Sequence, residues 1–202
     1  MRPLSLFLFL LASFTLAPPA SAQIAQTRAE ALAQDAAEYA RAYGVPGPEA
    51  MRRLIAQQDS VPAIDAIAER YRDRLAGISV EHHPHYRFIV YLTGDRPVPS
   101  TQVLAGAMRV PVQFRTGAKA SRERVLWALT NHQPAIRAAL ADTPSMGIDP
   151  RTGELVVIAA KPVVDRAGGD AAVAARLSQL TGVPVDRKST RLNSSHVLVS
   201  YA

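Results

Sequence analysis

Residues 146–159 read MGIDPRTGELVVIA, and this stretch decides the fold class. The segment Asp149–Gly153 combines aspartate, proline and glycine, the residue types that favour a tight turn. On either side of this turn the sequence is short, apolar and rich in β-branched side chains, which is typical of strands. A helix over residues 170–180 and a strand beginning at Val183 follow the hairpin. This part of the chain therefore predicts a small sheet with a helix on one face.

A second hairpin is expected earlier in the chain, where residues 78–80 and 86–92 are apolar and rich in strand-forming side chains. The strand that follows contains Pro111, and proline is usually confined to the edge of a sheet. A helix is then expected over residues 121–140, with Pro134 kinking or dividing it. This part of the chain repeats the pattern of a hairpin with a covering helix.

The helices before the first hairpin are indicated by their caps. Thr27 and Glu30 form a capping box ahead of an apolar face that lasts to Gly44. Two further helices are expected over residues 48–58 and 60–77, each with a proline near its first position.

The whole pattern predicts an α+β fold in which N-terminal helices precede two small units, each an antiparallel sheet with a helix. The shared order of hairpin, helix and return strand fits a duplication. We expect five parts: a signal peptide (1–22), an N-terminal helix pair (23–59), a first α+β unit (60–142), a second, truncated α+β unit (143–185) and a tail outside the fold (186–202).

The first 22 residues have the organisation of a secretory signal. Arg2 precedes an apolar run over residues 4–17, and the small-residue triplet Ala20–Ala22 follows it. The run is shorter than the roughly 20 apolar residues that a membrane span needs. We expect cleavage between Ala22 and Gln23, and export of a mature protein without a membrane segment to the periplasm or the outside of the cell.

The last 17 residues have a different origin in our interpretation. Residues 186–196, DRKSTRLNSSH, resemble the in-frame translation of a common sequencing adapter, and residues 200–202 fit a later part of the same oligonucleotide. We therefore expect that the gene was cut near Val185, that the native C-terminus is missing, and that residues 186–202 contribute nothing to stability.

Composition excludes several classes of function. The chain has no cysteine, which excludes disulfides, zinc-ribbon sites and a thiol nucleophile. Residues 23–185 carry a formal charge of +3 without a Lys/Arg stripe, so we expect no nucleic-acid partner. The sequence holds none of the glycine-rich nucleotide-binding motifs, and we expect no cofactor.

Three histidines form the most conspicuous polar group, His82, His83 and His85. On a strand His83 and His85 would share a face, which makes them candidate metal ligands. A third ligand would have to come from elsewhere, for example Glu81, and we favour a solvated turn because short histidine tracts often mislead. Neither Ser121 nor Ser145 stands in a nucleophile elbow, so no catalytic residue is assigned.

Several stretches resemble the N-terminal pro-regions of secreted bacterial chymotrypsin-fold serine proteases, of the α-lytic protease and streptogrisin type. Five stretches carry the resemblance: YGVP (43–46), EAMRRL (49–54), RLAGISVEH (74–82), PHYRFIV (84–90) and MGIDPRTGELVV (146–157). Residues 181–185, TGVPV, match the last strand of such regions. The resemblance covers most of residues 35–185.

The resemblance implies a non-catalytic module that precedes a trypsin-like protease domain, assists its folding and inhibits it. The Thr-Ala-Ala-His-Cys and Gly-Asp-Ser-Gly segments of such proteases have no counterpart here. The expected partner is therefore a C-terminal serine protease domain missing from this sequence. The alternatives are a self-standing secreted binding module or protease inhibitor and, less favoured, a periplasmic metal-binding protein that uses the histidines.

Overall fold

The computed structural model describes residues 27–189 and shows an α+β fold with N-terminal helices. The predicted cleavage site, Ala22 and Gln23, lies outside the described residues. The helices are α1 (Arg28–Tyr43), α2 (Gly47–Asp59), α3 (Val61–Arg70), α4 (Arg122–Leu140), α5 (Lys161–Arg166) and α6 (Asp170–Thr181). The strands are β1 (Leu75–Glu81), β2 (Arg87–Thr93), β3 (Thr101–Ala105), β4 (Met108–Ala118), β5 (Ser145–Asp149), β6 (Glu154–Ala159) and β7 (Val185–Ser189).

The local signals near the N-terminus are confirmed except around α3. Thr27 and Glu30 form the capping box at the start of α1, and Gly44 ends this helix in the left-handed conformation. The third helix ends at Arg70, so Gly77 lies in β1 and does not end a helix. The Ser60 hydroxyl donates to the Gln57 carbonyl at 2.8 Å and does not cap α3.

The first sheet has the strand order β1-β2-β4-β3, and β4 runs parallel to β2. The expectation of a purely antiparallel sheet is therefore wrong, and so is the edge position of the strand that contains Pro111. Pairing between β2 and β4 begins at Val112, so Pro111 is paired only with Gln102 of β3. Its missing N–H costs no hydrogen bond to β2, and this explains why proline is tolerated in an inner strand.

The second sheet has the order β5-β6-β7 and repeats the mixed pattern of the first. The Asp149–Gly153 turn joins β5 and β6 as predicted, and β7 then pairs in parallel with β6. In both sheets a hairpin is followed by a crossover and a strand parallel to the second hairpin strand.

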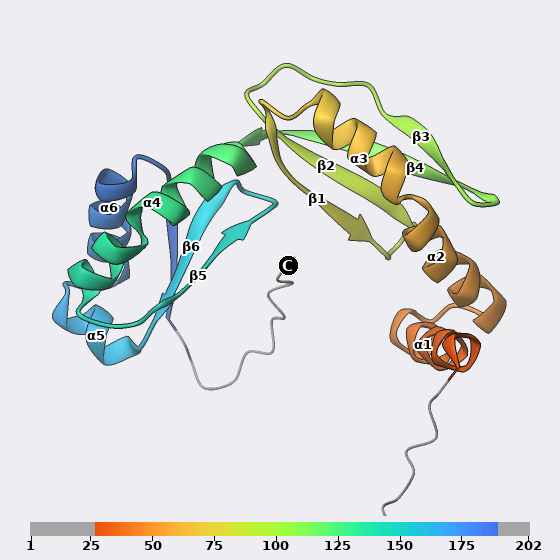
Figure 1. Ribbon diagram of the computed structural model, residues 1–202, viewed down its shortest axis with the longest axis horizontal. Coiled ribbons are helices and arrows are strands. Elements are labelled where there is room, and N and C mark those ends of the chain that lie inside the picture. Colours follow the sequence, from red (N-terminus) through yellow and green to blue (C-terminus); the bar gives the residue numbers. More distant parts are fainter. Residues whose placement is uncertain (1–26, 190–202) are drawn as a thin grey trace, which may run out of the picture.

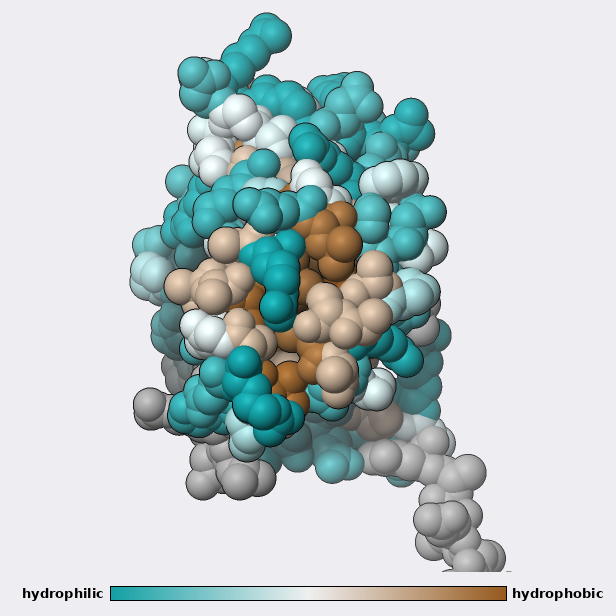
Figure 2. Space-filling view, turned by 90° about the vertical axis from the view of Figure 1, so that its left-hand side faces the viewer, coloured by the Kyte–Doolittle hydropathy of each residue, from teal (hydrophilic) through white to brown (hydrophobic). Residues whose placement is uncertain are grey.

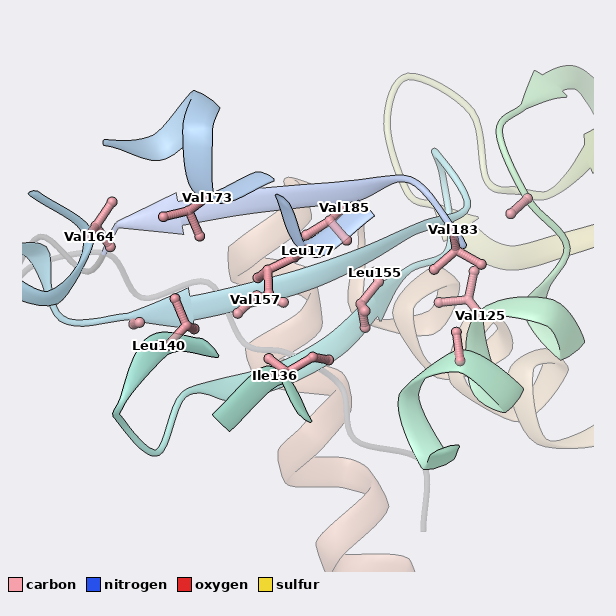
Figure 3. Close-up of a cluster of buried hydrophobic side chains, with 13 residues drawn as sticks. Val125, Ile136, Leu140, Leu155, Val157, Val164, Val173, Leu177, Val183 and Val185 are labelled. Carbon is pink, nitrogen blue, oxygen red and sulfur yellow. The ribbon is translucent and has the colours of Figure 1, made fainter. Parts of the chain in front are cut away.

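Each sheet has its own apolar core on one face. In the first, Phe88, Val90 and Leu92 of β2 pack with residues of α2 and α3. In the second, side chains of α4 and α6 point at Leu155 and Val157 of β6 (Figure 3). We call these two parts the first and the second lobe.

The packing of α4 moves the boundary between the lobes. Sequence order placed residues 121–140 in a first unit that ended at residue 142, but Val125, Ile136 and Leu140 belong to the second core. The change of lobe occurs between β4 and α4. Pro134 stands inside α4, which continues to Leu140 as one helix.

The expectation that everything after Val185 lies outside the fold is also wrong. Residues 185–189 form β7, and the Arg187 guanidinium donates to the Ala159 carbonyl at 2.9 Å. The Arg187 side chain is 1% exposed and lies 3.8 Å from Asp170. Residues 186–189 therefore complete the second sheet, whereas residues 190–202 lie outside the described part.

We predict that Arg187→Leu raises the free energy of unfolding by about 1 kcal/mol, because an apolar residue avoids the desolvation of a buried guanidinium. Burial lowers the pKa of Arg187, the sign of such a cost. Urea denaturation followed by circular dichroism measures the change. Arg176→Leu is the control, since this exposed arginine on α6 also donates to a carbonyl, that of Ala139. A loss of stability in Arg187→Leu would contradict the prediction.

The two lobes form the arms of an arch in Figure 1, joined near the start of α4. At the junction the Lys119 N–H donates to the Thr152 carbonyl at 2.8 Å, and the Lys119 ammonium pairs with Glu154 at 2.7 Å. A Cβ atom at Gly77 would overlap Pro150, and one at Gly153 would overlap the Ala120 carbonyl. Glycine at these two positions lets the lobes approach closely. Within residues 27–189, no helix combines the length and apolarity that crossing a membrane requires.

Candidate binding surface

Helices cover one face of each sheet. On the opposite faces the apolar side chains are buried among their neighbours: Ile89, Tyr91 and Val156 are 1%, 8% and 2% exposed, and Ile89 and Tyr91 form a small cluster with Ala76. Because side chains alternate along a strand, Ile89 and Tyr91 of β2 point away from the first core. Val156 and Ile158 of β6 point away from the second core in the same way. In Figure 1 the strands β5 and β6 lie nearer the gap of the arch than α4 and α6 do.

The open face of the first sheet is organised by an ion-pair chain. Glu81 at the end of β1 pairs with Arg87 of β2, its cross-strand neighbour, and with Arg115 of β4 at 3.4 Å. The two arginines lower the pKa of the Glu81 carboxyl, chiefly through the hydrogen bond from Arg87. The carboxylate therefore stays ionised near neutral pH and holds both arginines on this face.

Polar groups surround the buried centre of the same face. The Ser79 hydroxyl donates to the Tyr91 hydroxyl at 3.3 Å. Ser79 and Gln113 are both cross-strand neighbours of Ile89, which is 1% exposed. Among the described residues nothing donates to the buried Gln113 Oε1 atom. The face thus presents polar and charged groups around an apolar centre that is already buried.

A depression of about 300 Å³ lies where this face meets the β5–β6 turn. It is lined by Tyr91, Arg115, Thr116, Gly117, Ala118, Lys119, Arg151 and Thr152. Three of these residues are cationic, and Glu81 and Glu154 neutralise Arg115 and Lys119. Arg151 is exposed and forms no ion pair with a described residue. The depression therefore favours a partner that presents a carboxylate or another anionic group.

A separate apolar area lies on the outer side of the second lobe. Figure 2 faces this side and shows apolar side chains gathered near its centre inside a hydrophilic rim. The large apolar side chains of α4 and α6 that are more than a third exposed are Leu126, Trp127 and Leu180, at 40%, 61% and 37%, and of these Leu126 faces α3 and Leu75 of the first lobe. Trp127 contacts His132 edge to face at a centroid distance of 5.6 Å.

The candidate histidines do not form a metal site in this structure. The His83 Nε2–H donates to the Tyr43 carbonyl at 2.6 Å, and His85 forms no hydrogen bond or ion pair with a described residue. Within residues 27–189, no three His, Cys, Asp or Glu side chains gather as a metal site would require. The structure thus brings neither candidate together with a third ligand.

The interpretation of residues 82–85 as a solvated turn fits residues 83–85, which form an exposed bend, but not His82. His82 is half-buried, and its Nδ1 atom lies 2.7 Å from the Tyr39 hydroxyl. The tyrosine partners come from α1, about forty residues earlier in the chain. Aromatic spacing in α1 was visible in the sequence, but its contact with this loop was not.

Comparison of the sequence with family models and with curated proteins gives no match. The function is therefore argued from the geometry above and from the motifs quoted under Sequence analysis.

Proposed function

We propose that this chain is the non-catalytic, pro-region-like N-terminal part of an exported trypsin-like serine protease, whose protease domain it helps to fold and then inhibits. The observation that carries the proposal is the arch, in which each of two small sheets is covered by helices on one face only. An arch with open strands offers a folded partner a larger contact than a flat surface of the same size. Binding the native form alone stabilises that form by mass action.

Pairing of a strand edge gives such a module its affinity, because the backbone groups of an edge strand are ready to accept another strand. Within the described residues, the outer edges of β1, β3, β5 and β7 pair with no further strand. The β5 strand, Ser145–Asp149, contains no lysine, arginine or proline, the residues that natural edge strands use to prevent pairing. The β7 strand carries the charged residues Asp186 and Arg187. The β1 and β3 strands also lack these residues, and we assign the partner's strand to the β5 edge because β5 ends at the turn that carries Arg151 beside the depression.

The anionic preference of the 300 Å³ depression supports the same arrangement. Arg151 lies in the turn that ends β5, so a partner strand beside β5 passes close to this guanidinium. A carboxylate on that strand would pair with Arg151 and fix the register of the two strands.

The purified chain tests the proposal when it is added to a mature secreted chymotrypsin-fold protease. We expect slower hydrolysis of a peptide substrate, and a higher yield of active protease when the denatured enzyme is refolded with the chain. Ser145→Lys should weaken both effects by about tenfold, because lysine at an edge opposes pairing. Thr101→Lys is the matched control, since Thr101 is also the exposed first residue of an edge strand, β3.

Equal effects of Ser145→Lys and Thr101→Lys would remove the β5 edge from the proposal. No inhibition and no gain in refolding with a panel of such proteases would remove the proposal itself. The locus offers a second test, because reads past codon 185 should encode His, Asp and Ser signature segments of a trypsin-like domain. A natural stop after Ala202 would contradict it.

A further inference from the structure

The first helix packs on α2 and, near its C-terminal end, contacts the loop between β1 and β2. Ala36 and Tyr39 are the buried residues of α1, and they pack in a cluster with Ala50 of α2. This cluster is separate from the core of the first sheet. The link from α1 to the sheet runs through the loop between β1 and β2, and this link adds to the attachment that α2 provides.

That link is a stack of aromatic rings and two hydrogen bonds. The Tyr43 ring lies nearly parallel to the His82 ring at a centroid distance of 4.3 Å. The Tyr39 hydroxyl lies 2.7 Å from His82 Nδ1, and the Tyr43 carbonyl accepts from His83 at 2.6 Å. We call Tyr39, Tyr43, His82 and His83 the α1 latch.

The hydrogen bond from the Tyr39 hydroxyl to His82 needs a neutral imidazole. Burial raises the pKa of Tyr39, so its hydroxyl keeps its proton and can donate to the Nδ1 lone pair of His82. A protonated imidazole carries a hydrogen on both nitrogens and can only donate, so the Tyr39 oxygen would have to accept from it, although Arg53 already donates to that oxygen. Protonation of His82 therefore reverses this hydrogen bond and brings a second positive charge to the Tyr39 oxygen.

The charges around His82 also oppose its protonation. On α2, the Arg53 guanidinium donates to the His82 carbonyl at 3.3 Å and lies 5.3 Å from the centre of the Tyr86 ring, which also contacts His82. The carboxylate on this side, Glu49, is held by Arg53 at 2.8 Å and by Arg52 at 2.5 Å.

The titratable groups on the β1–β2 loop do not stabilise a protonated His82 either. The neighbouring Glu81 is bound by two arginines of β2 and β4, and His83 is a second titratable ring. Burial lowers the pKa of His82, and Arg53 and His83 lower it further. From α1 the imidazole meets only the two tyrosines of the latch.

We propose that the α1 latch is a pH-responsive switch, in which protonation of His82 releases α1 from the β1–β2 loop in mildly acidic solution. The docked form binds the proton less tightly than the released form. Docking is therefore fully favourable above the ordinary histidine pKa of about 6.5 and weakens as the pH falls through the lowered value. This switch does not depend on the proposed function, since it concerns only how α1 is attached.

Hydrogen exchange of the full chain tests the switch between about pH 7.5 and about pH 5, the range in which histidine titrates. After correction for the intrinsic exchange rate, protection of the amides of residues 28–43 should fall by about tenfold. In His82→Gln the protection should not change with pH, because a glutamine carbonyl accepts from Tyr39 and does not titrate. His85→Gln, an exposed change in the same loop, should behave like the unaltered chain.

The same acid loss in His82→Gln would overturn the proposal, and so would constant protection in the unaltered chain. Titration of the His82 ring by NMR in the unaltered protein tests the switch without any variant. A midpoint clearly below the ordinary histidine value supports the switch, and a midpoint at or above that value overturns it. His83→Gln should leave the midpoint of the α1 transition within a few tenths of a pH unit, because glutamine still donates to the Tyr43 carbonyl.

Discussion

Leu177→Ala is expected to lower the free energy of unfolding by about 3 kcal/mol. Leu177 of α6 is fully buried in the second core, where it lies among side chains of α4, β6 and β7 (Figure 3). Alanine removes apolar contacts and leaves a cavity that the two sheet strands and α4 cannot close without moving. Urea denaturation followed by circular dichroism measures the loss.

Leu180→Ala is the matched control for this prediction. Leu180 lies on the same helix, three residues further on, but is 37% exposed. The same atoms are removed with less burial lost and no closed cavity left behind, so the expected change is smaller, about 1 kcal/mol. Equal losses in the two variants would show that α6 does not pack on the sheet through Leu177.

Gly153→Ala should cost roughly 3 kcal/mol, through two effects that add at one position. Gly153 has a φ of 68°, a conformation that disfavours any side chain. A Cβ atom there would also overlap the Ala120 carbonyl, which lies where the chain passes from the first lobe to the second. Either the β5–β6 turn or the segment before α4 must therefore shift in the variant.

Gly94→Ala separates the two effects. Gly94 has a similar φ of 71°, but no atom lies within 4 Å of a Cβ built at this position. Only the backbone strain remains, so we expect a loss of about 1 kcal/mol. Thermal unfolding of both variants gives the comparison, and a difference near zero would mean that the lobe junction yields without cost.

The sequence predicted those parts of the fold that depend on neighbouring residues. The capping box of Thr27 and Glu30 and the turn over Asp149–Gly153 need only a few adjacent side chains to specify them, and both are confirmed. The short α5 is not predicted, because a six-residue helix of KPVVDR has no apolar period to detect.

The errors concern contacts between distant residues. A helix such as α4 has an apolar face, but the face does not say which of two sheets it will cover. Pro111 is expected at an edge because proline lacks the N–H that an inner strand needs to pair on both sides. In the structure β2 pairs with β4 only from Val112 onward, so Pro111 needs no partner on that side. The register between parallel strands follows from tertiary packing, and the sequence pattern alone does not contain it.

The candidate surface was even less accessible to sequence reasoning. The histidines stand out in the sequence, but the partners of His82 and His83 lie on a helix about forty residues away. Arg187 occupies a position where alternation with Val185 predicts an apolar side chain, so its burial contradicts the pattern.

Each lobe is built from one uninterrupted stretch of chain, and this has a consequence for how the protein is made. All strands of the first sheet, with the helices that cover them, precede residue 119, and every residue of the second core follows it. As the polypeptide leaves the ribosome, the earlier lobe has all its parts while the later one still waits for Val185. The two lobes can then fold in the order of synthesis, because neither needs residues of the other to bury its own apolar side chains.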